Sequence, residues 1–308
     1  MKLFSLQGEQ MKPVAPQAFT LEKDIQQIVE RNLSEIFSLV FVKSELSIKN
    51  FRIDTLAYNP ETRAFVIIEY KKDRNFSVID QGYTYMSLLL NSKADFVLEY
   101  NECKATSLKR DDVDWSQSKV IFVSPQFTEY QKHSVNFKDV PFELWEIKKY
   151  DNNIVGFIEH KTTSSESIAT VTNENSSVVK AVSSEIKVYT EEYHLTKSKN
   201  PNPKTVALYK RLREMIVNLG DVEVVPKGLY ISFERRKPFV DVVIYQRQGL
   251  YVVINMKKGT LKDPDNLTKD VSSLGHWGNG DYSFMLYPDS DLDYVIFLIK
   301  QSYDRQAG

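Results

Sequence analysis

The chain has 308 residues, 42% of them hydrophobic and 12% aromatic, and a formal net charge of -1. This composition is typical of a globular protein that buries sizeable cores, and the length favours two domains over one. A charge near zero argues against a strong non-specific DNA binder, because phosphate contacts carry most of that affinity, but it allows an enzyme with a local basic groove.

Signals of export or membrane insertion are not found in the sequence. Cys103 is the only cysteine, so no internal disulfide can form. Glu9 and Lys12 interrupt any apolar run near the N-terminus, and no stretch approaches the roughly 20 apolar residues of a membrane span. The sequence therefore predicts a reduced, cytoplasmic protein without a membrane partner.

The chain is expected to begin with an extended arm, because Pro13 and Pro16 argue against a helix within residues 1–18. Residues 20–37 then carry apolar side chains at helical spacing and predict the first helix.

Glu22 is a candidate site acid on this predicted helix. At about 100° per residue it falls between Val29 and Leu33, inside the apolar stripe, whereas Glu30 falls well outside it. A carboxylate on an inward face needs a partner, a metal or a solvated cleft. The alternative is that Glu22 occupies the first helical turn, where its negative charge suits the helix dipole.

Three strands are expected next, at residues 37–48, 51–58 and 65–68. Asn and Pro at residues 59–62 supply turn geometry and join the last two strands into a hairpin. The third strand is an uninterrupted apolar run, as expected of a strand covered on both faces, and it ends abruptly at Glu69.

A second helix follows, which Ser77 is expected to cap with Asp80 three residues further on. Gln81 and Tyr85 are four residues apart and share one face of that helix. Residues 95–100 are expected to form a fourth strand. The predicted order is helix, three strands, helix, strand.

Two carboxylates and a lysine are expected to meet at one edge of this sheet. Glu69 and Lys71 are two apart and point to the same side of their strand, and the hairpin brings Asp54 near them. Asp54, Glu69 and the backbone carbonyl of Tyr70 would suit a hard divalent cation, Mg²⁺ or Mn²⁺. Lys71 would orient an attacking water and meet a phosphate, which is the equipment for phosphodiester hydrolysis.

Gln81 and Tyr85 on the helix would position the phosphate or the lysine. Each motif alone is weak, because a Glu-x-Lys at a strand end is usually a solvated ion pair. The ordered set is more specific: an Asp, a turn, an apolar strand ending in Glu-x-Lys, and then Gln-x₃-Tyr on the next helix.

In this order the motifs resemble the PD-(D/E)XK nuclease superfamily, and most closely its NucS-like and RecB-like branch with a Gln-x₃-Tyr helix. The resemblance covers roughly residues 19–100. It implies a restriction-endonuclease-like αβββαβ core and catalytic roles for the motif aspartate, the (D/E)XK pair, the helical pair and a first-helix acid, at Asp54, Glu69, Lys71, Gln81, Tyr85 and Glu22. It also implies that Glu22 joins Asp54, Glu69 and the Tyr70 carbonyl as a metal ligand. Ile53 departs from the "Pro-Asp" element, which is usual in this divergent superfamily.

The fold class predicted for the whole chain is α/β (α+β), with a second mixed α/β domain after the nuclease-like core. Strands near residues 119–124, 142–149 and 154–160 and a short helix near 127–135 complete a first domain at residues 1–160. Residues 161–188 shift to Ser, Thr, Val, Asn and Glu and are interpreted as a linker that could hold an extended strand at 177–182.

Residues 189–308 are expected to form the second domain. Pro203 opens a helix that stops at Gly220, and strands and a closing helix follow it. The expected strands and final helix lie at residues 222–225, 229–233, 239–245, 250–256, 282–287 and 292–303. This half resembles an uncharacterised domain found behind nuclease-like domains, in proteins labelled as predicted transport proteins; the lack of any spanning segment argues against transport.

The second half also echoes the first. Asp241 precedes Asn255 by 14 positions and Lys257 follows, as Asp54 precedes Glu69 by 15. A degenerate nuclease-like domain that binds rather than cuts would explain the echo, since Asn lacks the charge to hold Mg²⁺ well; coincidence between mixed α/β patterns is the alternative. His276 and Trp277 in the Gly-rich loop 275–280 could stack on a base, although such loops are more often turns with one buried aromatic.

The leading hypothesis is a Mg²⁺- or Mn²⁺-dependent nuclease, with DNA favoured over RNA as its partner and a homodimer allowed. The alternatives are a non-catalytic nucleic-acid-binding or assembly module that keeps the fold, and a protein-interaction adaptor. A basic rim at Arg52, Lys72 and Arg74 would favour nucleic acid over a protein partner.

Overall fold

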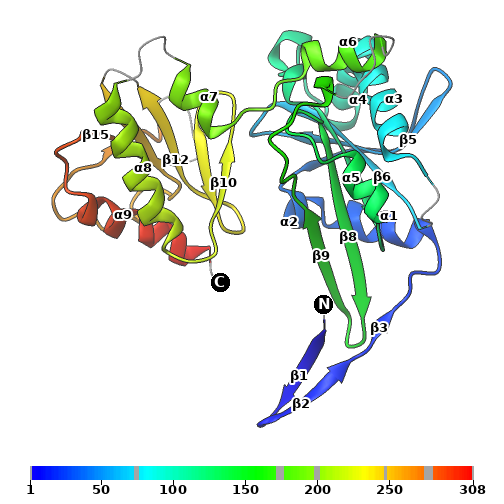
Figure 1. Ribbon diagram of the computed structural model, residues 1–308, viewed down its shortest axis with the longest axis horizontal. Helices are drawn as coiled ribbons and strands as arrows, with labels where there is room; N and C mark the ends of the chain where they lie inside the picture. Colours follow the sequence, from blue (N-terminus) through cyan, green and yellow to red (C-terminus); the bar gives the residue numbers. More distant parts are fainter. Residues whose placement is uncertain are drawn as a thin grey trace. The chain divides into compact units, whose positions relative to one another are not determined.

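The structure, a computed structural model, describes residues 2–72, 76–170, 177–197, 202–245, 248–273 and 280–306. The chain divides into two compact units, Met1–Val188 and Tyr189–Gly308 (Figure 1). Among the described residues, no helix has the length and apolar character needed to cross a membrane.

Unit 1 contains nine described strands: β1 (Leu3–Gln7), β2 (Gln10–Val14), β3 (Pro16–Gln17), β4 (Val40–Ile48), β5 (Phe51–Asn59), β6 (Ala64–Tyr70), β7 (Lys119–Ser124), β8 (Phe142–Tyr150) and β9 (Ile154–His160). Its described α-helices are α1 (Glu22–Arg31), α2 (Leu33–Phe37), α3 (Val78–Asn91), α4 (Lys93–Lys104), α5 (Glu129–Ser134) and α6 (Ser177–Glu185). Short 3₁₀ turns lie at Arg110–Asp112, Trp115–Gln117 and Ile168–Thr170.

Seven of these strands form one mixed sheet in the order β3-β8-β7-β6-β5-β4, with β9 pairing to β8. Strands β4, β5 and β6 are a meander of antiparallel neighbours, whereas β6 and β7 are parallel and so are β7 and β8. The chain order α1, β4, β5, β6, α3, β7 is the predicted αβββαβ order, so the mixed α/β fold class is confirmed.

Two hydrophobic cores lie on opposite faces of this sheet. Along β6, Phe65 and Ile67 pack in the core that α3 covers, and Val66 and Ile68 pack in the core that contains α1 residues such as Val29. Side chains alternate between faces along a strand, so a strand covered on both sides must be apolar throughout. All of β6 is buried, as its uninterrupted apolar sequence predicts.

Three sequence-based expectations in unit 1 are wrong. Residues 95–100 lie within helix α4 rather than in a strand, and β7 is the fourth strand of the core. Residues 177–182 belong to helix α6, whose Val182 is buried in the unit 1 core. The expected helix 20–37 is broken at Asn32 into α1 and α2. Short apolar runs fit a helix or a strand equally well, so tertiary packing decided the first two.

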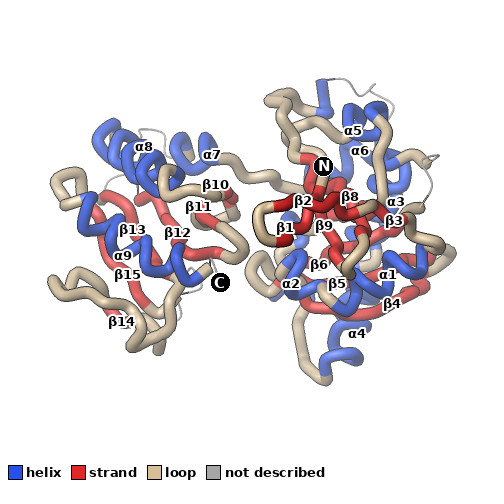
Figure 2. Tube along the Cα trace, turned by 90° about the horizontal axis from the view of Figure 1, so that it is seen from below, coloured by secondary structure: helices blue, strands red, loops and turns tan. Residues whose placement is uncertain are grey.

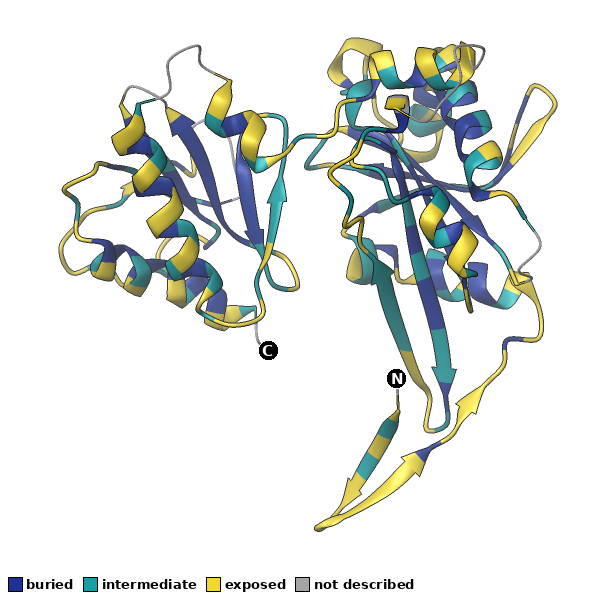
Figure 3. Cartoon of the chain, in the orientation of Figure 1, coloured by how far each residue is buried: buried dark blue, intermediate teal, exposed yellow. Residues whose placement is uncertain are grey.

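The N-terminal arm is an isolated two-stranded hairpin of β1 and β2, which Figure 3 shows to be mostly exposed. Cross-strand pairs Phe4–Pro13 and Leu6–Met11 give it one apolar face. The chain then joins the main sheet through β3, which pairs with β8. The arm was predicted as an extended segment, and that prediction is confirmed.

Unit 2 contains α7 (Glu191–Thr196), α8 (Pro203–Val217), β10 (Glu223–Pro226), β11 (Ile231–Glu234), β12 (Pro238–Tyr245), β13 (Gly249–Ile254), β14 (Lys269–Asp270), β15 (Tyr282–Leu286) and α9 (Leu292–Arg305). The strands run in the order β10-β11-β12-β13-β15-β14. Helices α8 and α9 pack against β12 and β13 (Figures 1 and 2). Helix α7 is an element that the apolar spacing did not predict.

The pairing of unit 2 does not repeat that of unit 1. Strands β13 and β15 are antiparallel, whereas β6 and β7 are parallel. Asp241 and Asn255 do meet, with the Asn255 amide donating to the Asp241 carboxylate over 3.0 Å and the Ser232 hydroxyl donating over 2.6 Å. The strand pairs described in unit 2 are all antiparallel, so Asp241 and Asn255 do not lie beside a parallel pair as Glu69 does in unit 1. His276 and Trp277 lie outside the described residues.

His194 makes the stability of unit 2 depend on pH. Its ring is buried, and Nε2 lies 2.7 Å from the carbonyl oxygen of Lys227. Burial lowers the pKa of His194 below its usual value, with a smaller contribution from the charge of Lys197, although the Lys227 carbonyl opposes the shift. As the pH falls through about 6.5, His194 is therefore protonated in the unfolded chain before it is protonated in the folded unit.

We expect unit 2 to lose stability as the pH falls from 7 to 5, and His194→Gln to flatten that dependence. Hydrogen exchange of unit 2 peptides, measured by mass spectrometry across this range, checks the prediction. His133→Gln is the matched control, because His133 is exposed in unit 1. An equally steep pH dependence in His194→Gln would contradict the assignment.

Candidate active site

The predicted carboxylates come together where the pairing of β5 with β6 ends. Thr55 pairs with Ile68, so continuing the antiparallel register by one residue sets Asp54 opposite Glu69. Asp54 is half-buried, and its Oδ2 accepts a hydrogen bond of 3.1 Å from the Tyr70 backbone amide. Glu69 is buried, with only 3% of its surface exposed. An acid at the end of an otherwise apolar strand is stable there only if donors surround it.

Helix α3 supplies two of those donors. Ser77 caps the helix by accepting from the Asp80 amide, as predicted. The first turns of α3 carry Gln81 and Tyr85. Gln81 Nε2 lies 2.6 Å from Glu69 Oε1, and the Tyr85 hydroxyl lies 2.8 Å from Glu69 Oε2. Gln81 also donates to the Tyr85 hydroxyl over 3.1 Å. The helical pair therefore holds Glu69, a role that sequence spacing alone did not assign.

Lys71 completes the cluster. Its Nζ lies 2.6 Å from Glu69 Oε1, and 23% of its side chain is exposed. Burial lowers the pKa of Lys71, but the Glu69 hydrogen bond and the charges of Glu69, Asp54 and Glu22 outweigh it, so the pKa lies above its usual value. Lys71 is therefore a cation at neutral pH and keeps a path to solvent.

Glu69 perturbs Asp54. Burial and, next, the charge of Glu69 raise the pKa of the Asp54 carboxyl to about 6, against the opposing effects of the Tyr70 amide and Lys71. Two carboxylates at one site disfavour each other's ionised form. Such a pair at a strand edge is typical of a functional site, because packing alone would replace the acids with apolar residues.

Glu22 lies at the edge of the cluster and is exposed, so the expectation that it is inside the apolar stripe is wrong. It is the first residue of α1, and its Oε2 accepts a 2.8 Å hydrogen bond from the Lys72 backbone amide. Its charge nevertheless raises the pKa of Lys71. The inward position that Glu22 was assigned belongs to Gln26, one helical turn later.

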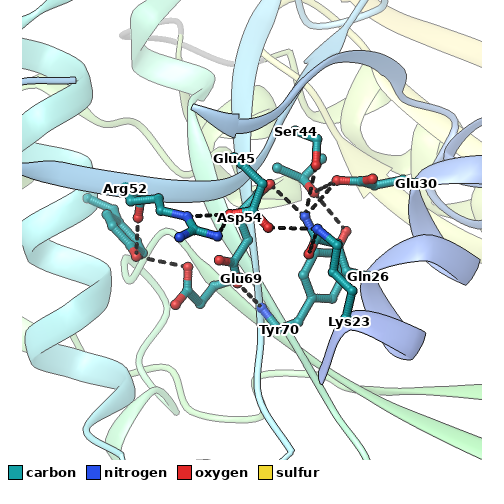
Figure 4. A network of polar contacts seen from close by, with 11 residues as sticks. Lys23, Gln26, Glu30, Ser44, Glu45, Arg52, Asp54, Glu69 and Tyr70 are labelled. Carbon is teal, nitrogen blue, oxygen red and sulfur yellow. Dashed lines mark hydrogen bonds and ion pairs between the residues drawn. The ribbon is translucent and has the colours of Figure 1, made fainter. Parts of the chain in front are cut away.

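Gln26 anchors a polar network behind the carboxylates (Figure 4). It is 4% exposed, and its Nε2 lies 3.0 Å from the Asp54 carbonyl, 3.0 Å from Ser44 Oγ and 2.9 Å from Glu30 Oε1. The buried Thr55 hydroxyl donates to Glu30 over 2.6 Å. The network ties α1 to the strands that carry the candidate site.

Sequence reasoning missed this network. Glu30 was placed well outside the apolar stripe, yet it is half-buried and bonded to Thr55. A usable signal was present: Thr55 is a polar residue on the face of β5 that looks toward α1, and Gln26 is polar at an apolar position of the helix. A buried polar group on each of two packed elements predicts that the two are bonded.

Exposed cations surround the cluster. Lys23 and Arg52 both pair with Glu45, Lys23 over 2.8 Å, and Lys72 Nζ donates to the Thr20 carbonyl over 2.8 Å. The hydrogen bond from Lys23 is the main reason that the pKa of Glu45 lies below its usual value. Of the residues of the predicted basic rim, Arg52 and Lys72 are exposed and Arg74 lies outside the described residues.

The oxygen atoms of the cluster suit a hard cation in part. Asp54 Oδ1 has no hydrogen-bond partner among the described residues, and three donors leave Glu69 one of its roughly four lone-pair positions. The Tyr70 amide points to Asp54, and the carbonyl of the same residue faces the same side of a strand. Within the described stretches, no three His, Cys, Asp or Glu side chains are grouped to hold a metal. A cation here would thus rest on two carboxylates, a carbonyl and waters.

One relative matches this chain over almost its whole sequence. A protein of Haemophilus influenzae, described as an uncharacterized protein, is 47% identical over 304 residues, which cover 98% of this chain and 99% of that protein. The chain belongs to its family. In the second half of this chain, residues 191–306 match the model of a domain of unknown function, DUF5655. The match lies in unit 2 and leaves the candidate site of unit 1 outside it.

Three solved structures share a weak likeness with the chain. They are an EndoMS–dsDNA complex (14% identity, TM-score 0.27), a repair endonuclease from Pyrococcus abyssi (15%, 0.23) and SfsA of Pyrococcus furiosus with Ca²⁺ (11%, 0.24). The likeness covers 44%, 44% and 49% of this chain and 60%, 60% and 76% of those chains. The chain thus spans less than two thirds of the first two.

Replacing Gln26 with Leu tests whether the network supports the site. The change removes the Gln26 donor from the Asp54 carbonyl and leaves Glu30 with only the Thr55 hydroxyl, and we expect unit 1 to lose about 1–3 kcal/mol of stability toward urea. Gln27→Leu is the matched control, since Gln27 is the next residue of α1 and is exposed. Equal losses in the two variants would show that the network contributes nothing.

Proposed function

We propose that the chain is a metal-dependent nuclease of the PD-(D/E)XK type that hydrolyses phosphodiester bonds, with DNA as the favoured substrate. One observation carries the proposal: of the residues in the ordered motif, Lys71, Gln81 and Tyr85 all bond to Glu69, and Asp54 lies opposite Glu69 and accepts from the adjacent Tyr70 amide. A chance motif would scatter these residues over the fold.

The proposed roles follow from the contacts of each residue. Asp54 and Glu69, with the Tyr70 carbonyl, would hold Mg²⁺ or Mn²⁺, ions that prefer oxygen ligands and retain waters. Once bound, such an ion supplies charge neutralisation at the phosphate and an acidified water. Lys71 would hold the attacking water and contact the phosphate, because its Nζ lies beside Glu69 and reaches solvent.

The remaining residues would position this set. Gln81 and Tyr85 fix both oxygens of Glu69, so its carboxylate is oriented before any ligand arrives. Glu22 would act at the edge, through its charge on Lys71. Arg52 and Lys72 lie where the nucleic-acid backbone would approach, and they would compensate locally for a chain whose net charge is -1.

A cleavage panel tests the activity. We expect the wild-type chain to cut at least one of single-stranded, duplex or branched DNA or RNA with Mg²⁺ or Mn²⁺, and Glu69→Gln and Lys71→Met to lower the rate at least a hundredfold. Each variant removes one charge that the reaction needs while keeping the side chain's size.

Glu102→Gln and Lys104→Gln are matched controls, because both residues are exposed on α4 and lie outside the cluster. They should cut like wild type. Pure wild-type chain that cuts none of the substrates, yet binds them equally well with and without the Glu69→Gln change, would sink the nuclease proposal and support the non-catalytic binding module.

Metal binding is tested without turnover. We expect Mn²⁺ to raise the melting temperature of wild-type chain, because a ligand that binds only the folded state stabilises it. Asp54→Asn should abolish the rise and, by ending the repulsion from Glu69, should not lower the metal-free melting temperature. A full Mn²⁺ response in Asp54→Asn would place the ion elsewhere.

A further inference from the structure

A cavity of about 480 Å³ lies in unit 1 next to helix α1. Its walls come from α1, from the segment that leads into it and from β8: Ala18, Phe19, Thr20, Asp24, Gln27, Ile28, Arg31, Asn32 and Lys149. Asp24, Gln27, Ile28 and Arg31 recur at helical spacing, so one face of α1 forms one wall. The volume is that of an ordinary ligand pocket.

Two cations of the cavity wall have no partner among the described residues. Neither the Arg31 guanidinium nor the Lys149 ammonium has a hydrogen bond or ion pair within the described part of the chain, although 15 other ion pairs form there. The wall has one acid, Asp24, whose Oδ2 accepts a 3.0 Å hydrogen bond from the Leu21 amide. Two cations against one acid leave the wall with a net positive charge.

Neutral groups complete a set suited to an anion. The Gln27 side-chain amide has no partner among the described residues and can donate. The other nearby acid, Asp151, is held by the Gln17 amide over 2.6 Å. Phe19 and Ile28 supply an apolar part of the wall. A guanidinium group and an ammonium group, together with amide donors, are commonly used to bind a phosphate.

The cavity adjoins the candidate active site. Thr20, one of its wall residues, accepts a hydrogen bond from Lys72 Nζ over 2.8 Å, and Glu22 accepts from the Lys72 backbone amide. Lys72 directly follows Lys71, the cation of the proposed catalytic cluster. A strand whose phosphate lay at Lys71 would therefore meet Lys72 next and then the cavity.

The geometry points to a second phosphate-binding subsite, in which Arg31 and Lys149 hold a backbone phosphate of a nucleic-acid strand that runs from the Asp54–Glu69–Lys71 cluster past Lys72. This subsite rests on the proposed function. Because the contacts are made to phosphate and not to bases, it binds without regard to sequence.

The test measures binding without turnover. A fluorescent single-stranded oligonucleotide is titrated with full-length chain in EDTA at several salt concentrations. For the double variant Arg31→Gln/Lys149→Gln we expect about tenfold weaker binding at low salt. The slope of log affinity against log salt should fall by about 1 to 1.5, since each phosphate contact to a single strand contributes about 0.7.

Lys104→Gln/Lys109→Gln is the matched control, because it also removes two exposed cations, from the α4 end of the unit. Circular dichroism confirms that both double variants are folded. Equal affinities and slopes in the two double variants, or no oligonucleotide binding by wild type, overturn the subsite.

Further measurements distinguish a nucleic-acid strand from a small anion as the ligand of the subsite. Inorganic phosphate or a mononucleotide that raises the melting temperature of wild type but not of Arg31→Gln/Lys149→Gln, while oligonucleotide binding is unchanged, overturns the nucleic-acid strand in favour of a small anion. Cleavage with unchanged binding slopes would sink the subsite alone. A reduced slope without any cleavage would retain the subsite and sink the nuclease.

Discussion

Two carboxylates on neighbouring strands set the main constraint on unit 1. Groups directly opposite each other in an antiparallel pair have Cβ atoms about 5 Å apart. At an effective dielectric constant near 20, two unit charges at that separation repel by roughly 3 kcal/mol. The fold meets this cost with donors: Lys71, Gln81 and Tyr85 on Glu69, and the Tyr70 amide on Asp54. A protein selected only for stability would not retain the pair.

Groups that hold Asp54 and Glu69 come from both faces of the sheet, so the site depends on both helices of the αβββαβ order. Helix α3 reaches Glu69 from one face, whereas Gln26 of α1 holds the Asp54 main chain from the other. Each helix is fixed by its own hydrophobic core, with Val29 on one side and Met86 on the other. The carboxylates therefore stay in place without a ligand, which is the preorganisation that catalysis needs.

The sequence predicted what short-range patterns determine. The apolar run of β6, the Ser77 cap and the Gln81–Tyr85 spacing each fix local geometry, and the cluster they predict is found. It could not place residues 95–100, because a short apolar run fits α4 as well as a strand. Gln26 and Glu30 escaped notice for a different reason: their partners, Asp54 and Thr55, are more than 20 residues away, and only tertiary packing brings them together.

Net charge is a poor guide to nucleic-acid binding when charges are paired unevenly. The chain totals -1, yet the cations near the carboxylates are paired at short range: Lys23 and Arg52 share Glu45, which leaves one positive charge, and Lys71 pairs with Glu69. Paired charges add little to the field at a distance greater than the Debye length of about 8 Å. Under the proposed function, the field that a nucleic-acid backbone would meet is set by cations that have no acid partner among the described residues, and Lys72, Arg31 and Lys149 are three of them.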